Sequence, residues 1–379
     1  MRVFISTADA SGDLHAAGLV DALRDALDER GEPLYAFGLG GEALASVGFR
    51  TLVEQRDLAV AGLVEVLAHA PRMIGGYLRL RRALRREKPD VAIFVDTPDL
   101  NLPLAAVAKR AGIPVFYYVS PQVWAWRTAR VHSLRRRVDH VGVIFPFEEG
   151  LLREAGVPAT FVGHPLVDRF EQFRERLEPD AVARDLALDR GRPIVGLLPG
   201  SRRNEIAGNL ACMLETAEIL RDAVPEVQVC LLLAPTLAEP PAPVPDWIQQ
   251  VRGRTHEAIA ISTVLVAAPG TVTVEAALLR TPLIVTHQAN RISFELARRI
   301  SRVPSSCMVN LIADRGVVSE RLQEMARPAA LAGEVAHLIH DAGAREEMCK
   351  ALDDATARLG GTGASRRAAA LALEVAGRP

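Results

Sequence analysis

A glycine, a serine and two arginines follow a predicted buried strand near the middle of the chain. The stretch at residues 194–205, IVGLLPGSRRNE, passes from an apolar run through a Pro-Gly turn into a predicted helix. Gly200 lets the backbone approach a ligand closely, and the helix start offers free N–H groups and the positive end of its dipole. Ser201 and Arg202 add a hydroxyl and a cation there. These residues predict a phosphate-binding loop.

A second loop of this kind lies at residues 267–277, AAPGTVTVEAA. Glu275 follows Thr271 by four residues, which places both on one face of a helix, one turn apart. We expect Thr271 and the N–H groups after Gly270 to hold a diphosphate, and the Glu275 carboxylate to accept two ribose hydroxyls. The alternative is a helix start with a capping Thr and an early acidic residue. The two loops together favour a nucleotide site, because both follow parallel strands.

Asp96 ends another buried strand, VAIFV at residues 91–95. A carboxylate at the carboxyl end of a parallel strand faces the ligand side of the sheet, and desolvation there moves a carboxyl pKa towards that of a general base. We therefore expect Asp96 to be catalytic. Asp99 follows Pro98, in the first turn of the next helix, where an acidic residue is favourable for structural reasons.

The turn after the first predicted strand offers two further candidates. Residues 3–13, VFISTADASGD, end on Asp13, and His15 follows. A neutral imidazole can act as a base or contact an acceptor. The alternative for both side chains is a helix cap and a place in the core.

The order of the predicted elements indicates an α/β protein with two doubly wound parallel-sheet domains. Apolar runs alternate with helical stretches, which is typical of βαβ units. A length of 379 residues also favours two cores over one. We expect domains at residues 1–168 and 188–345, a cleft between them that holds the active site, and a helical tail at 346–379. The tail either packs back on the first domain or is exchanged in a homodimer.

The predicted strands lie at residues 3–6, 34–38, 91–95, 115–119, 140–145, 160–162, 227–233, 264–267 and 282–286, with one more starting at residue 194. The predicted helices lie at residues 14–30, 41–46, 62–87, 102–111, 128–137 and 293–300, and they fill most of 328–376.

Composition and charge exclude several classes of protein. A net charge of −1 argues against a general nucleic-acid binder. No leader-like segment and no run of about twenty apolar residues is visible, and the four cysteines lack CxxC spacing, so we expect a cytoplasmic protein. No Ser/His/Asp order or His/Cys cluster indicates a hydrolase or a metal enzyme. Arg202 and Arg203 can neutralise a diphosphate without Mg²⁺, which favours a transferase without metal or cofactor.

The stretch at residues 58–74, LAVAGLVEVLAHAPRMI, is apolar on nearly all sides and precedes an Arg-rich segment at 79–88. An apolar patch rimmed by cations can dip into an anionic membrane surface without spanning it. The alternatives are a helix buried in the core and a solvated basic face. The side chains expected to face the membrane are Val64, Val66, Leu67, Met73, Ile74, Arg79 and Arg82.

The chain resembles the lipid-A-disaccharide synthase family of glycosyltransferases, family 19, whose members have the GT-B fold. The resemblance is most specific at residues 118–130, YVSPQVWAWRTAR. Further matching motifs lie along nearly the whole chain, at residues 11–13, 58–67, 95–101, 145–148, 163–165, 198–205 and 270–275.

The resemblance implies an inverting enzyme that transfers 2,3-diacylglucosamine from UDP to the 6-hydroxyl of 2,3-diacylglucosamine 1-phosphate. The products are the β-1,6 lipid A disaccharide and UDP. The resemblance also implies that the enzyme acts at the cytoplasmic face of the inner membrane and that it needs no metal or cofactor and binds no nucleic acid. By resemblance Asp96 is the base, Arg202 is needed for activity and Asn310 lies near the nucleotide. The acceptor side is expected to include the first-turn residues Asp9, Ser11, Asp13 and His15.

Several positions depart from the family pattern. Asp9 stands where the family commonly has Glu, and the others lie in the nucleotide half. Two other functions remain open: a divergent GT-B relative, such as another UDP-sugar transferase or a UDP-N-acetylglucosamine 2-epimerase, and a binding module without turnover. The departures in the nucleotide half are Pro269, His287, Gln288, Val309 and Asp314.

Overall fold

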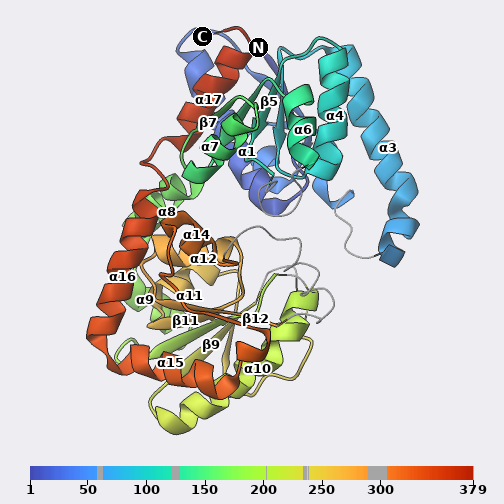
Figure 1. Cartoon of the computed structure of the whole chain (residues 1–379). Helices are drawn as coiled ribbons and strands as arrows, with labels where there is room; N and C mark the ends of the chain where they lie inside the picture. The colour runs from blue at the N-terminus through green and yellow to red at the C-terminus, as the bar shows by residue number, and fades with distance from the viewer. Residues whose placement is uncertain are drawn as a thin grey trace. The chain divides into compact units, whose positions relative to one another are not determined.

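The computed structural model divides into two compact units (Figure 1). Unit 1 comprises Met1–Asp168 with Gly360–Pro379, and unit 2 comprises Arg169–Leu359. The structure describes residues 1–57, 63–121, 129–201, 203–233, 237, 239–288 and 305–378, with the backbone alone at 63–70, 129–130 and 204. The predicted helix at 293–300 and most of the motif at 118–130 lie outside the described residues.

Unit 1 is built on a parallel sheet of seven strands. They are β1 (Arg2–Ser6), β2 (Tyr35–Gly40), β3 (Arg50–Glu54), β4 (Val91–Val95), β5 (Val115–Tyr118), β6 (His140–Val143) and β7 (Ala159–Phe161), in the spatial order β3-β2-β1-β4-β5-β6-β7. The described helical segments are α1 (Ala10–Asp28), α2 (Glu42–Ser46), η1 (Gln55–Asp57), α3 (Leu63–Glu87), α4 (Pro98–Arg110), α6 (Ala129–Arg137), α7 (Pro146–Glu154) and α17 (Ala364–Val375). Helix α8 (Pro165–Arg176) crosses the boundary, because its residues from Arg169 onward belong to unit 2.

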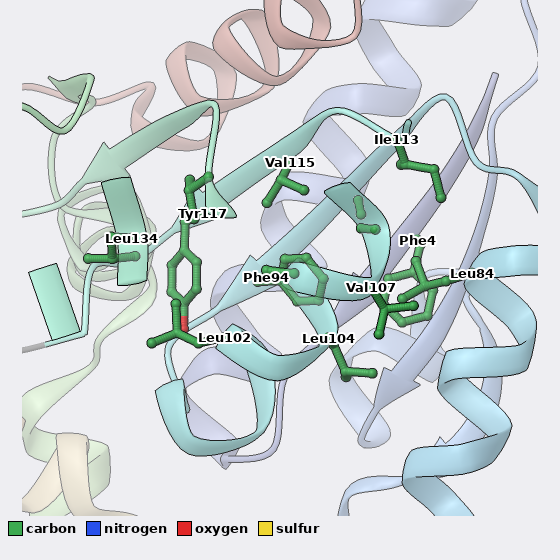
Figure 2. Close-up of a cluster of buried hydrophobic side chains, with 14 of the residues drawn as sticks. Phe4, Leu84, Phe94, Leu102, Leu104, Val107, Ile113, Val115, Tyr117 and Leu134 are labelled. Atoms are coloured by element: carbon green, nitrogen blue, oxygen red, sulfur yellow. The ribbon is translucent and has the colours of Figure 1, made fainter. Parts of the chain in front are cut away.

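Helices cover both faces of this sheet, so the central strands are apolar throughout. All five residues of β4 are buried. On one face the strands pack against α3, α4 and α6, and Figure 2 shows this cluster around Phe94 and Tyr117. On the other face lie α1 and α17, which pack against each other.

The C-terminal helix α17 is anchored within unit 1 by polar contacts at its start. Asp168 accepts hydrogen bonds from the backbone N–H groups of Gly363 (2.5 Å) and Ala364 (3.1 Å). Arg367 donates to the carbonyl of Val162 (2.8 Å). The tail that the sequence analysis begins at residue 346 is thus divided, because its first part belongs to unit 2.

Unit 2 is built on a parallel sheet of six strands. They are β8 (Ile194–Leu198), β9 (Gln228–Leu233), β10 (Gln249–Arg252), β11 (Val264–Ala267), β12 (Leu283–His287) and β13 (Glu320–Leu322), in the spatial order β10-β9-β8-β11-β12-β13. The described helical segments are α9 (Pro179–Asp185), α10 (Arg203–Ala223), α11 (Thr255–Ile261), α12 (Thr271–Leu278), α14 (Met308–Ala313), η2 (Gln323–Met325), α15 (Pro328–His340) and α16 (Ala342–Ala357).

The predicted fold class, two doubly wound parallel sheets, is confirmed. The sequence analysis missed three strands, β3, β10 and β13, and each lies at the edge of its sheet. Their burial is partial, and β10, with the sequence QQVR, buries only Val251. An edge strand covered on one side at most does not carry the continuous apolar run of a central parallel strand. The helix predicted to start at residue 102 starts instead at Pro98, at the helix N-terminus, where proline is favourable.

Candidate functional site

Asp96 lies at the carboxyl end of β4, in an unusual backbone conformation. Asp96 and Thr97 both have left-handed conformations, with φ of 44° and 42°. The Asp96 side chain is half-buried, and Asp99 is exposed in the first turn of α4, as predicted. Consecutive left-handed residues other than glycine cost conformational energy and concentrate at functional sites.

The first-turn residues lie beside this turn. Asp9 is the N-cap of α1: one carboxylate oxygen accepts from the N–H of Gly12 (2.7 Å) and the other lies 3.2 Å from the Thr97 hydroxyl. Asp9 therefore connects the start of α1 to the β4–α4 turn. The Ser11 hydroxyl is 3.4 Å from Nε2 of His15.

The buried carboxylate of Asp13 holds a neighbouring loop. It accepts from the N–H groups of Gly41 (2.7 Å) and Ala43 (2.8 Å), at the start of α2. These contacts favour the structural alternative for Asp13. His15 is buried, and its ring centre lies 6.0 Å from that of His164. Burial, with His15 nearby, lowers the pKa of His164 well below the ordinary value, so this imidazole is neutral.

In unit 2 a cavity of about 650 Å³ opens at the carboxyl ends of the strands. Loops after β8, β10 and β11 line it, and Phe173 of α8 forms part of one wall. Both predicted phosphate loops contribute, through Gly200 and Ser201 and through Gly270, Thr271 and Glu275. Its size is that of a typical small-molecule site. Arg202 lies outside the described residues.

Both loop glycines have positive φ, 126° at Gly200 and 150° at Gly270. A Cβ at Gly200 would lie 2.8 Å from the Cβ of Glu205, so a larger residue does not fit there. Gly270, not Thr271, is the N-cap of α12. Thr271 is therefore not the capping residue, and the binding of a diphosphate at this helix start stays a prediction.

Glu275 is held by an aromatic cluster at the wall of the cavity. His256 Nε2 lies 3.3 Å from Oε2 of Glu275. The His256 ring packs edge to face against Phe170 and Phe173, with centroid distances of 4.9 and 6.0 Å. These contacts restrict both the imidazole and the carboxylate. The sequence analysis missed His256, because the His–Glu proximity depends on adjacent helices, α11 and α12.

Asn310 is committed to bonds inside unit 2. Its Nδ2 donates to the carbonyl of Val318 and to Glu320, both at 2.9 Å, and its Oδ1 accepts from the N–H groups of Val317 and Val318, both at 2.8 Å. These four bonds use both N–H donors and both lone pairs of the amide. The side chain is also 7% exposed. This geometry favours a positioning role for Asn310 over direct nucleotide contact.

Glu320 is the acceptor at the centre of the same network. It accepts hydrogen bonds from the hydroxyls of Ser305 and Ser306 and from the N–H of Ser306 (2.9 Å), besides the bond from Asn310. Burial alone would raise the pKa of Glu320, but the hydrogen bonds from Ser305, Asn310 and Ser306 outweigh it and lower the pKa. The ionised carboxylate therefore stabilises the segment that leads into α14.

A buried amide that the sequence analysis missed supports the first of the two predicted phosphate loops. Asn209 of α10 donates to the carbonyl of Pro199 (2.8 Å) and accepts from the N–H of Gln288 (2.7 Å). Gly208 permits this approach, because a Cβ there would lie 2.3 Å from the Gln288 carbonyl oxygen. Gln288 also donates to the carbonyl of Ala326 (3.0 Å), so this departure from the family pattern fits its surroundings. Asp314, another departure, takes the left-handed conformation (φ 53°) that the family's Gly adopts easily.

The predicted membrane-facing segment lies on α3. The side chains of Val64, Val66 and Leu67 lie outside the described residues. Ile74 is 60% exposed, Arg79 and Arg82 are exposed, and Met73 is partly buried. Leu78, which the sequence analysis did not select, is 37% exposed. Across the described residues, no helix combines the length and the apolar character needed to cross a bilayer.

In the part of the chain that the structure describes, no three His, Cys, Asp or Glu side chains come together as a metal-binding group. The metal-independent reaction stays a prediction.

Solved structures share this architecture. A UDP-GlcNAc 2-epimerase from Neisseria meningitidis, bound to UDP-GlcNAc, matches with a TM-score of 0.62 and 11% identity over 98% of each chain. A glycosyltransferase from Rickettsia africae matches with a TM-score of 0.57 and 11% identity, over 99% of this chain and 98% of that one. These likenesses establish the fold: two doubly wound domains of the GT-B class.

Sequence relatives define the family. The lipid-A-disaccharide synthetase family model matches residues 3–375. Lipid-A-disaccharide synthases from Trichlorobacter lovleyi and Myxococcus xanthus are each 40% identical, over 382 and 388 residues, and each comparison covers 99% of this chain and 97% of the relative. The chain belongs to the lipid-A-disaccharide synthetase family, a family of glycosyltransferase enzymes.

The Glu320→Gln variant is expected to have a lower thermal unfolding midpoint at pH 7, because an amide NH₂ would face hydroxyl and N–H donors. The expected loss in the free energy of unfolding is about 1–3 kcal/mol. The folded-state pKa of Glu320 lies below its unfolded value, so its contribution is present above the unfolded pKa, about 4.3, and is lost as the pH falls through the folded pKa. The difference between wild type and variant should therefore shrink below about pH 4. Glu346→Gln, an exposed residue of α16, is the control, and equal midpoints for both variants at pH 7 would contradict the role of Glu320.

Proposed function

We propose that this chain is a lipid-A-disaccharide synthase. It would transfer 2,3-diacylglucosamine from UDP to the 6-hydroxyl of 2,3-diacylglucosamine 1-phosphate. The observation that carries the proposal is the match of nearly the whole chain to relatives of that name. The epimerase alternative is supported by fold likeness alone, at 11–12% identity.

We assign the donor's nucleotide to the cavity of unit 2. The N–H groups at the starts of α10 and α12 offer donors and positive dipole ends to a diphosphate. Gly200 and Gly270 leave room for close approach, and Glu275 accepts the ribose hydroxyls. The resemblance adds Arg202, whose guanidinium would neutralise the charge that develops on the departing UDP.

We assign the acceptor to unit 1, with Asp96 as general base. The acceptor's 6-hydroxyl oxygen attacks the anomeric carbon of the donor while the bond from that carbon to the UDP oxygen breaks. Asp96 takes the hydroxyl proton, and UDP leaves with the bonding electron pair. Attack from the face opposite UDP inverts the anomeric centre and gives the β linkage.

The reaction is tested with UDP-diacylglucosamine and diacylglucosamine 1-phosphate, by measuring disaccharide and UDP. Asp96→Asn is expected to lower kcat roughly 10²–10⁴-fold, the usual size of a general-base contribution, with UDP affinity unchanged. Asp99→Asn, the exposed acidic neighbour in the first turn of α4, is the control and should keep nearly wild-type activity.

If folded wild-type protein forms neither product, the proposed function is refuted. UDP binding without transfer would then favour the binding-module alternative, and conversion of UDP-N-acetylglucosamine to its 2-epimer would favour the epimerase. Wild-type turnover by Asp96→Asn would remove Asp96 as the base.

The nucleotide assignment is tested separately by calorimetry. Glu275→Gln is expected to weaken UDP binding roughly tenfold to hundredfold, because a charged acceptor of hydrogen bonds is lost. Wild type should bind 2′-deoxy-UDP or 3′-deoxy-UDP more weakly than UDP, and the variant should discriminate much less. Glu346→Gln, outside the cavity, is the control. Undiminished discrimination by Glu275→Gln would show that another group binds the ribose.

We further propose that α3 docks unit 1 on an anionic membrane surface, which for this enzyme would be the cytoplasmic face of the inner membrane. In Figure 1, α3 lies beside α4 at one edge of unit 1. Ile74, Leu78, Arg82 and Arg85 are exposed and recur along one helical face at spacings of three or four residues. Apolar side chains next to arginines suit the boundary between acyl chains and headgroups. The homodimer stays a prediction.

Sedimentation with phosphatidylglycerol vesicles tests this surface. Wild type is expected to sediment with them at low salt, less at high salt and not with phosphatidylcholine. The double variant Ile74→Asp/Leu78→Asp should reduce vesicle binding several-fold. Two apolar contacts with the acyl chains would be lost, and the new carboxylates would be repelled by the anionic lipids. Leu151→Asp changes an exposed leucine (47%) of α7 in the same unit and is the matched control. If the control loses as much binding as the α3 double variant, α3 is not the docking surface.

A further inference from the structure

The turn at Asp96 requires an external restraint. Left-handed conformations are unfavourable for residues other than glycine, and Asp96 and Thr97 adopt them in succession. Such a turn persists only when surrounding contacts over-determine it. The question is which side chains supply those contacts.

Two buried side chains bind the main-chain carbonyl of Asp96. Asn101, three residues into α4 from Pro98, donates from Nδ2 to this carbonyl at 2.8 Å. The Tyr117 hydroxyl, from the neighbouring strand β5, donates to the same oxygen. Both side chains are fully buried. The carbonyl therefore has both lone pairs occupied by groups from two different elements.

Asn101 also ties the turn to the sheet. Its Nδ2 lies 3.0 Å from the carbonyl oxygen of Val95 and 3.1 Å from that of Ser6, and its Oδ1 accepts from the Ser6 hydroxyl at 2.7 Å. One amide thus connects α4 to the ends of β1 and β4. Its position is fixed by these strands independently of Asp96.

Tyr117 is fixed by packing. Figure 2 shows its ring in the apolar cluster with Phe94 and Leu102, and the hydroxyl oxygen at the end of the ring near Leu102. The ring centroids of Phe94 and Tyr117 are 6.3 Å apart. A tyrosine enclosed in this way has no freedom to move its hydroxyl, so the group is a rigid donor.

We propose that Tyr117 and Asn101 are positioning residues that hold the Asp96 carbonyl and thereby fix the direction in which the Asp96 carboxylate leaves the backbone. Neither touches substrate in this proposal. It rests on the proposed function only for the catalytic role of Asp96. A backbone that relaxed from the left-handed conformation would move the carboxylate, and misplacement of a catalytic group by about 1 Å costs as much as 10²-fold in rate.

The adjacent residue provides a matched control. Tyr118 is also a fully buried tyrosine of β5, but it points to the opposite face of the sheet, where α17 packs. Its hydroxyl lies near Ser365 of α17, and burial raises its pKa. Tyr118→Phe therefore removes the same hydroxyl from the same strand without altering the contacts of the Asp96 carbonyl.

The experiment compares Tyr117→Phe with Tyr118→Phe in the full chain. Tyr117→Phe is expected to lower kcat between about tenfold and a hundredfold, with KM and UDP affinity within about twofold of wild type. Tyr117→Phe is expected to lower the thermal midpoint somewhat more than Tyr118→Phe, because it removes a hydrogen bond to a buried carbonyl. Asn101→Asp, which retains size but lacks the amide donors, is expected to lower kcat at least as much. Equal kcat for Tyr117→Phe and Tyr118→Phe would overturn the proposal.

Hydrogen exchange supplies a readout that does not depend on activity. The Asp96 N–H lies near the carbonyls of Tyr118 and Val119, at 3.4 and 3.3 Å, so relaxation of the turn should expose it. Exchange across residues 96–101 is expected to be faster in Tyr117→Phe than in Tyr118→Phe, and equal rates would again overturn the proposal. If wild type makes no disaccharide, the proposed function fails while this comparison still decides whether the two side chains hold the turn.

Discussion

Within each sheet the described strands are all parallel to one another, and this constraint governs the rest of each unit. Each connection must return across a face of the sheet, so the helix that follows a strand starts at the same edge. In unit 2 this edge collects the helix starts and glycines that line one cavity. In unit 1 it collects the starts of α1 and α4, with Asp9 in contact with Thr97. The proposed sites lie at these edges because the topology leaves the backbone groups of the loops there.

Buried asparagines recur as the means of fixing these loops. Asn101 joins β1 and β4 to α4, Asn209 joins the loop after β8 to the end of β12, and Asn310 joins α14 to the approach to β13. Each lies on a helix and bonds to backbone groups of a different element. An amide suits this task because it donates and accepts without a charge that burial would penalise. Three of the loops are thus held by neutral amides, while the carboxylates of Asp13 and Glu320 hold others through several hydrogen bonds each.

The sequence was sufficient to predict the central strands, the order of the two domains and the positions of the glycine loops, because continuous apolar runs and Gly turns are local signals. Edge strands such as β10 were not predictable, since QQVR buries one side chain. The position of a residue at the end of a strand was predictable, as at Asp96 and Gly270, although their roles stay predictions. Contacts that depend on tertiary structure were not predictable: His256 meets Glu275 only through the packing of α11 against α12. Asn310 was placed near the nucleotide by resemblance alone, which does not reveal its four internal hydrogen bonds.

The anchoring of α17 has a consequence for how the chain folds during synthesis. Unit 2 is one continuous stretch of chain, whereas unit 1 is assembled from two stretches separated by all of unit 2. Helix α17 covers an apolar part of one face of the unit 1 sheet. This part has no helix packed on it until residues 364–375 have left the ribosome. Unit 1 is therefore synthesised first but completed last. The hydrogen bond between Asp168 and Gly363 can form only after all of unit 2 has been translated.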